Sequence, residues 1–113
     1  MDIQHKNNGV YSTLLLAGRL DATSAAEAEQ KIGEIINGGA ANLLLDLTKL
    51  EFISSAGLRV LLVTAKKLLR QNGKLALCGL QDTVRIVFEV SGFLSIFQIA
   101  GDAAEAAKFF EKT

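Results

Sequence analysis

The chain has 113 residues, of which 50% are apolar and 21% are charged, a composition typical of a folded globular protein and not of a disordered segment. Twelve Lys and Arg balance twelve Asp and Glu, and this zero formal charge argues against binding of nucleic acid through bulk charge. With only Cys78 and His5, the chain has no means of forming an internal disulfide or an ordinary structural zinc site.

The first residues, Met1 to Lys6, contain no apolar signal core, and no apolar run approaches the roughly 18 residues that a membrane span needs. We therefore expect a cytoplasmic protein with no membrane partner. The length predicts one domain over residues 1–113, because domains typically run to about 100–150 residues.

Hydrophobic periodicity and turn residues predict nine elements. In chain order they are strands over residues 3–6 and 10–17, a helix beginning near 24, a strand over 42–47, a helix beginning near 54, a strand over 74–79, a helix over 82–90, a strand over 96–100 and a helix after 102. Asn7-Asn8-Gly9 is the turn signal of an opening hairpin, and Gly18 is expected to close its second strand. Residues 48–53 are interpreted as a turn.

The first helix is expected to use Thr23 or Ser24 as its cap, with Glu27 three residues beyond Ser24. In the second helix, Leu58 to Leu69 form a regular apolar stripe. After the hairpin, strands alternate with helices, and this order predicts an α/β fold with a mostly parallel central sheet and right-handed crossovers.

The segment from Asp46 to Leu58 carries the clearest functional signal. A buried strand ends at Asp46, and after a short turn Ser54 and Ser55 open a helix. Sites in open α/β sheets form beyond the carboxyl ends of strands, and a helix N-terminus offers unpaired N–H groups. A hydroxyl there is accessible to modification, although the structural alternative is that both serines only cap the helix.

The motifs of an independent enzyme are missing. The serines are not in a Gly-x-Ser-x-Gly motif, and nothing places His5 beside them as a base. The chain has no phosphate-binding loop and no dinucleotide-binding fingerprint. We therefore expect no enzymatic activity, no cofactor and no metal.

Charged side chains surround the predicted site. Asp21 and Asp46 are both predicted at strand ends, where they either cap and face solvent or form an acidic rim beside the serines. The second helix carries Arg59 and Arg70 with no acid anywhere between residues 52 and 81, which is either a solvated face or a docking surface for an acidic partner. Cys78 is predicted to be a small core residue.

Three segments resemble the anti-sigma factor antagonists of the STAS domain superfamily. They read Gly-Arg-Leu-Asp-Ala-Thr at 18–23, Leu-Leu-Asp-Leu at 44–47 and Phe-Ile-Ser-Ser-Ala-Gly-Leu-Arg-Val-Leu-Leu at 52–62. The resemblance spans nearly the whole chain, including the hairpin and residues 88–93. It implies a STAS-like fold and a bacterial partner-switching module that is regulated by phosphorylation.

In that family, a serine at the start of the second helix is phosphorylated by an ATP-using protein kinase that is also the anti-sigma factor, and a dedicated serine phosphatase removes the phosphate. The unmodified antagonist binds the anti-sigma factor and frees the sigma factor, whereas the phosphorylated form lets go. The family motif is Asp-Ser-Ser-Gly with its first serine modified. Counting back from Gly57 gives Ser55 the modified position, so Ser54 replaces the Asp and Ala56 the second Ser. Ser54 remains a second candidate acceptor.

The resemblance also implies a docking patch around Ser55 on a protein that is monomeric when free. Its expected residues are Asp21, Thr23, Ser24, Asp46, Ser54, Ala56, Gly57, Leu58 and Arg59. Two other functions stay open: a STAS-type scaffold or subunit of a transporter or signalling complex that is never phosphorylated, and a binder of a small ligand or nucleotide at the same sheet edge.

Overall fold

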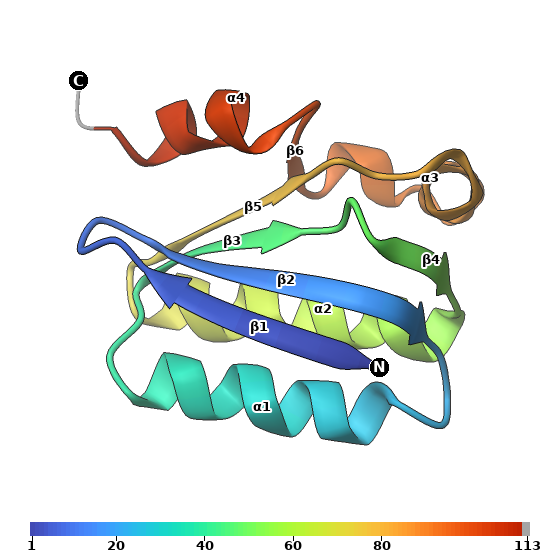
Figure 1. Ribbon diagram of the computed structural model, residues 1–113, viewed down its shortest axis with the longest axis horizontal. Helices are drawn as coiled ribbons and strands as arrows, with labels where there is room; N and C mark the ends of the chain where they lie inside the picture. Colours follow the sequence, from blue (N-terminus) through green and yellow to red (C-terminus); the bar gives the residue numbers. More distant parts are fainter. Residues whose placement is uncertain (112–113) are drawn as a thin grey trace.

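The computed structural model describes residues 1–111. Within them, strands and helices follow one another in an order close to the predicted one (Figure 1). The elements are β1 (Asp2–Asn7), β2 (Ser12–Leu20), α1 (Ala25–Asn37), β3 (Asn42–Asp46), β4 (Leu50–Ile53), α2 (Ser55–Arg70), β5 (Lys74–Cys78), α3 (Asp82–Val90), the 3-10 turn η1 (Phe93–Ser95), β6 (Gln98–Ala100), α4 (Ala103–Ala107) and the 3-10 turn η2 (Lys108–Phe110).

The opening hairpin forms as predicted, because the two asparagines satisfy the turn's backbone. The Asn7 Oδ1 accepts a hydrogen bond from the Gly9 N–H at 2.8 Å, and the Asn8 Oδ1 accepts from the N–H groups of Val10 and Tyr11, each at 2.9 Å. Such side-chain bonds to the following backbone are what make Asn a turn residue. β1 and β2 then pair antiparallel.

The sheet has the order β1-β2-β3-β5-β6, and every pairing after the hairpin is parallel. α1 and α2 cover one face of this sheet, α4 lies on the other, and α3 sits beside β4 (Figure 1). Burial alternates along β2, with Leu14 and Leu16 fully buried against the larger core. The α/β class with a mostly parallel sheet is therefore confirmed.

Two apolar cores lie on the two faces. The larger one joins the inward faces of β2, β3, α1 and α2 with α3. The smaller one lies under α4; its buried members are Leu44, Ala76, Cys78, Ala106 and Phe110. Cys78 is thus a core residue, as predicted.

Three boundary predictions were wrong. β2 does not stop at Gly18, which has φ +103 and lies at a shift of register, so that the strand bends and continues to Leu20. Residues 50–53 are not a turn but β4, which pairs with β2 and buries Leu50 and Ile53. The last strand begins only at Gln98, because Ile96 still has helical backbone angles as the C-cap of the 3-10 turn η1.

The apolar stripe of α2 was also read too broadly. Leu58, Leu61 and Leu68 are buried, but Leu69 is 74% exposed, whereas Val60 and Thr64 take the remaining inward positions. The buried Thr64 hydroxyl donates to the Val60 carbonyl at 2.8 Å, which satisfies its polar group inside the helix. Within residues 1–111, no helix is long and apolar enough to cross a membrane.

Candidate functional site

The candidate site lies where β2 and β4 end side by side. Leu20 pairs with Ile53 in the last register position of these two parallel strands. The Ser54 N–H donates to the Leu20 carbonyl at 3.0 Å, so the chain leaves β4 in contact with the end of β2. This contact brings the loop that follows β2 next to the first turn of α2.

Gly57 allows the helix to approach the strand ends this closely. A Cβ at this position would lie 2.5 Å from the Leu20 carbonyl oxygen and 2.7 Å from the Ile53 Cγ1. Backbone atoms cannot move aside cheaply at such distances. Gly57 is therefore a packing residue, buried beneath the site, and offers no side chain to a partner.

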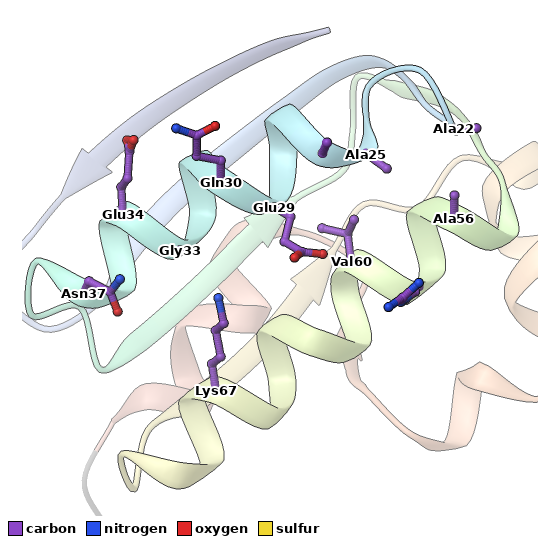
Figure 2. Close-up of a pocket in the computed structure, with 12 residues that line it drawn as sticks. Ala22, Ala25, Glu29, Gln30, Gly33, Glu34, Asn37, Ala56, Val60 and Lys67 are labelled. Carbon is purple, nitrogen blue, oxygen red and sulfur yellow. The ribbon is translucent and has the colours of Figure 1, made fainter.

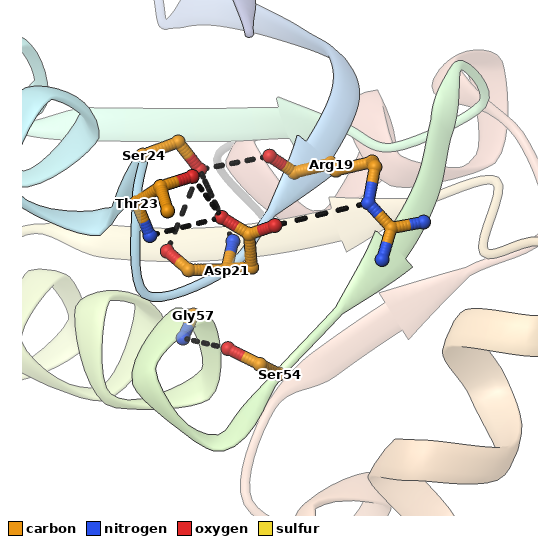
Figure 3. A network of polar contacts seen from close by, with 6 residues as sticks. All are labelled: Arg19, Asp21, Thr23, Ser24, Ser54 and Gly57. Atoms are coloured by element: carbon orange, nitrogen blue, oxygen red, sulfur yellow. Dashed lines mark hydrogen bonds and ion pairs between the residues drawn. The ribbon is translucent and has the colours of Figure 1, made fainter.

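Ser54 has the structural role that was considered for both serines. It is the N-cap of α2 in extended conformation, and its Oγ accepts from the Gly57 N–H at 3.4 Å (Figure 3). It is only half-buried, but its hydroxyl already serves the helix.

Ser55 is the exposed serine of the pair. Within residues 1–111 its hydroxyl has no hydrogen-bond partner, and the backbone N–H groups of Ser55 and Ala56 donate to no acceptor. The Leu58 N–H, by contrast, is taken by the Ser54 carbonyl at 2.9 Å. A free hydroxyl therefore lies at the positive end of α2, where a negative charge is favoured.

The loop after β2 is held by its own polar network (Figure 3). The Asp21 Oδ1 accepts from the Thr23 N–H at 3.0 Å and from the Thr23 hydroxyl at 2.7 Å. The Asp21 Oδ2 lies 3.7 Å from the Arg19 Nε. The Thr23 hydrogen bonds lower the pKa of Asp21 below its ordinary 3.8, with a smaller contribution from Arg19.

Ser24 works differently from the predicted cap. It is the N-cap of α1 by position, yet its side chain makes no capping bond to that helix, and Glu27 completes no capping box. Instead the Ser24 hydroxyl donates to the Arg19 carbonyl at 2.8 Å and accepts from the Asp21 N–H at 3.1 Å. It ties the loop back to β2, because the turn in which the Ser24 N–H donates to the Asp21 carbonyl at 3.2 Å brings Ser24 back toward the end of the strand.

Asp46 is not at this site. It pairs with Leu15 of β2, five positions before Leu20, and a strand rises about 3.3 Å per residue, which places Asp46 about 17 Å short of the end of β2, where the serines lie. It shares the sheet face of Leu44, the face that α4 covers. The expected acidic rim therefore contains Asp21 but not Asp46.

Leu58 is also absent from the surface. Its side chain is 3% exposed and belongs to the larger core, because it points inward one turn after Ser54. Of the other expected docking residues on α2, Ala56 is half-buried and Arg59 is exposed. The accessible surface around Ser55 is thus formed by the Asp21 loop and by the outer side of α2.

Two contacts that involve β4 were not predicted. The Arg19 guanidinium carbon lies 4.2 Å from the centre of the Phe52 ring, a cation–π contact that extends the surface from β2 to β4. The Thr83 hydroxyl donates to the Glu51 carbonyl at 2.9 Å and fixes α3 against β4. These contacts could not be predicted without β4, because only the pairing of β4 with β2 puts Phe52 beside Arg19.

A groove of about 690 Å³ runs between α1 and α2 and begins at the site, where Ala22 and Ala56 line it. Further along, Glu29 of α1 and Lys67 of α2 reach into it from opposite sides (Figure 2). Its walls carry both charges and no glycine-rich phosphate loop. Within residues 1–111 no three His, Cys, Asp or Glu side chains are placed to share a metal ion.

Comparisons with known proteins identify the family of the chain. Residues 3–106 match the model of the STAS domain family. BtrV of Bordetella bronchiseptica, provisionally assigned as an anti-sigma factor antagonist, is 44% identical over 96 residues, which are 85% of this chain and 83% of BtrV. The anti-sigma-F factor antagonist RsfB of Mycobacterium tuberculosis is 37% identical over 62 residues, 55% of this chain and 50% of RsfB.

Solved structures share the fold at lower identity. A provisionally assigned anti-sigma factor antagonist of Thermotoga maritima superposes with a TM-score of 0.92 at 21% identity, over 97% of this chain and 95% of that one. SpoIIAA of Bacillus in its phosphorylated form gives a TM-score of 0.73 at 23% identity, over 97% and 100% of the two chains. From its sequence, its sheet order and these relatives, the chain belongs to the STAS domain family.

Proposed function

We propose that the protein is an anti-sigma factor antagonist in a partner-switching system, with Ser55 as its phosphorylation site. In the unmodified state it binds an anti-sigma factor that is also a serine kinase, and a dedicated serine phosphatase reverses the modification. The protein is a substrate in this scheme, not an enzyme, and it acts in the cytoplasm as a monomer when free.

One observation carries the choice of residue. The Ser54 hydroxyl oxygen accepts the hydrogen bond that caps α2, whereas Ser55 is exposed and its hydroxyl has no hydrogen-bond partner within residues 1–111. A kinase must reach an oxygen with its γ-phosphate in line, and only Ser55 offers one without breaking a helix cap. This supports the assignment that the family motif implies.

The departure from the family motif is compatible with this role. Ser54 stands where the motif has Asp, and an Asp or a Ser in extended conformation can each cap a helix. The motif's carboxylate has no direct replacement at that position. Asp21, in the loop that follows β2, supplies an acidic group near α2 instead. Its hydrogen bonds from Thr23 lower its pKa and so favour the ionised carboxylate.

Release of the partner follows from the charge that phosphorylation adds to the surface around Ser55. A phosphate adds about −1.5 to −2 charges at pH 7, and burying these charges in an interface that is formed around an unmodified serine costs desolvation free energy. A loss of about 2.8 kcal/mol lowers affinity roughly a hundredfold, so no refolding is required.

The test combines the purified protein with Mg-ATP and each candidate anti-sigma factor kinase of the same genome. Intact-mass spectrometry should show one added phosphate on the wild type and on Ser54→Ala, and none on Ser55→Ala. Phosphate on Ser55→Ala but not on Ser54→Ala would move the site to Ser54. Stable binding of a kinase that modifies neither serine would favour the scaffold function.

A further inference from the structure

Arg59 lies one helical turn beyond Ser55 on the outer side of α2. Residues four apart on a helix are neighbours, with Cβ atoms about 5–6 Å apart. Arg59 is exposed, and within residues 1–111 no carboxylate lies within 4 Å of its guanidinium nitrogens. The nearby Asp21 forms its ion pair with Arg19 instead. The first turn of α2 contains no acid.

The surroundings leave Arg59 free for a new anion. Asp21 is engaged by Thr23 and Arg19. Glu29 of α1 lines the same groove as Arg59, but without forming an ion pair with it. Lys67, the other cation in this groove, reaches in near Gly33, more than two turns further along α2.

We propose that Arg59 binds the phosphate carried by Ser55. The order is the favourable one, with the anion toward the helix N-terminus and the cation four residues later. The unpaired N–H groups of Ser55 and Ala56 add donors on the same end of the helix. The inference rests on the proposed modification of Ser55 and states how that modification acts.

Phosphorylation then changes the docking surface twice. It adds negative charge at Ser55, and it engages Arg59, so that this cation is no longer available to the partner. Arg59 is the first cation of α2, and residues 52–81 contain no Asp or Glu. A partner that binds α2 through acidic groups can no longer pair with Arg59, and its acidic groups are also repelled by the phosphate. The backbone does not have to move for either effect.

The experiment needs no kinase, because phosphoserine is installed at position 55 during translation or by ligation of peptides. Phosphorus NMR then follows the second phosphate pKa with pH in the wild type, Arg59→Gln, Arg59→Lys and Arg70→Gln. Arg70 is the matched control, since it lies about 22 Å along the same helix from Ser55 at 1.5 Å per residue.

We expect the phosphate pKa of Arg59→Gln to exceed that of the wild type by about half a unit, from a charge about 6 Å away in water. Arg59→Lys should recover most of the difference, Arg70→Gln should match the wild type, and 0.5 M salt should shrink the gap. Equal pKa values in the wild type and Arg59→Gln would overturn the inference. That result would leave kinase modification of Ser55 untouched, just as a failed kinase assay would leave this titration intact.

Discussion

Two loops of the molecule use the same chemistry and end in different places. Asp21-Ala22-Thr23 follows β2, and Asp46-Leu47-Thr48 begins at the last residue of β3. In both, one carboxylate oxygen accepts from the threonine N–H at 3.0 Å and from its hydroxyl at 2.7 Å. Local sequence thus makes two equivalent turns at two strand ends.

The difference between the loops comes from strand length. β2 runs five residues past the point where Asp46 pairs with it, and β4 fills the place beside that extension. The Asp21 loop therefore lies next to α2, whereas the Asp46 loop begins beside Cys78 at the end of β5. A local motif fixes the shape of a turn, but the register of the sheet decides which neighbours it has.

The largest effect is expected from separating the Asp21 loop from α2. Gly57→Val puts a side chain against the Leu20 carbonyl and should destabilise the fold by about 3 kcal/mol or more, measured by urea unfolding. Gly33→Ala is the control, because its Cβ would meet only the flexible Lys67 Nζ at 3.3 Å, and it should be neutral or slightly stabilising. Equal losses for both variants would contradict the packing role of Gly57.

The next effect concerns charge at the two places. Ser55→Glu should weaken binding to the cognate anti-sigma factor about 10- to 100-fold, because one fixed negative charge enters the docking surface. Lys49→Glu changes the charge by two at the second loop and should bind as the wild type does. Calorimetric titration of both variants measures this, and loss of binding in Lys49→Glu would place the second loop in the interface.

A more conservative pair compares the two carboxylates directly. Asp21→Asn keeps an oxygen that accepts from Thr23 but removes the charge next to α2, and we expect binding about three- to tenfold weaker. Asp46→Asn makes the same change about 17 Å away and should leave binding unaltered. Surface plasmon resonance resolves such differences, and identical behaviour of the two variants would remove Asp21 from the site.

Asp21→Asn should also change the acid side of the stability curve. The folded pKa of Asp21 lies below its ordinary 3.8, so its carboxylate stabilises the fold at pH values above 3.8 and this contribution is lost as the pH falls through the folded pKa. The wild type should therefore lose more stability than Asp21→Asn between pH 4 and pH 2, followed by thermal unfolding.

The sequence was sufficient for the elements with strong periodic or turn signals. The hairpin, α1, α2, α3 and the inward strands follow from apolar spacing and from Asn and Gly at turns. It was not sufficient for β4, because four residues with an exposed Glu51 carry too little pattern to separate a strand from a turn. Without β4 the offset between the two loops could not be predicted, and Asp46 was placed with the serines.

The same limit explains the mixed result on α2. Ser54 and Ser55 were both recognisable as cap candidates, but which hydroxyl faces the helix depends on the φ and ψ angles of Ser54, which take the extended form only in the folded chain. From its spacing in the sequence, Leu58 could belong either to the buried apolar stripe of α2 or to an exposed docking patch. The approach of α2 to Leu20 turns it inward, and the sequence contains no separate signal for that approach.

The remaining predictions concern Cys78 of the neighbouring strand β5, which pairs with Asp46. Burial, with smaller contributions from the negative charges of Asp46 and Asp102, raises the pKa of Cys78 to about 11. A thiol whose folded pKa lies above its ordinary 9.0 stabilises the fold in its neutral form, and that contribution is lost as the pH rises from about 9 to 11. The wild type should lose more stability than Cys78→Ala across this window.

The two carboxylates can be told apart once more at this thiol. Asp46→Asn removes a negative charge from beside Cys78 and should lower the pKa of the thiol, whereas Asp21→Asn should leave it unchanged. Thiolate absorbance at 240 nm, corrected with the background absorbance of Cys78→Ala, gives the pKa in each variant. If both substitutions shifted the thiol equally, the two loops would share one electrostatic environment, and the offset between β3 and the end of β2 would not separate them as the register requires.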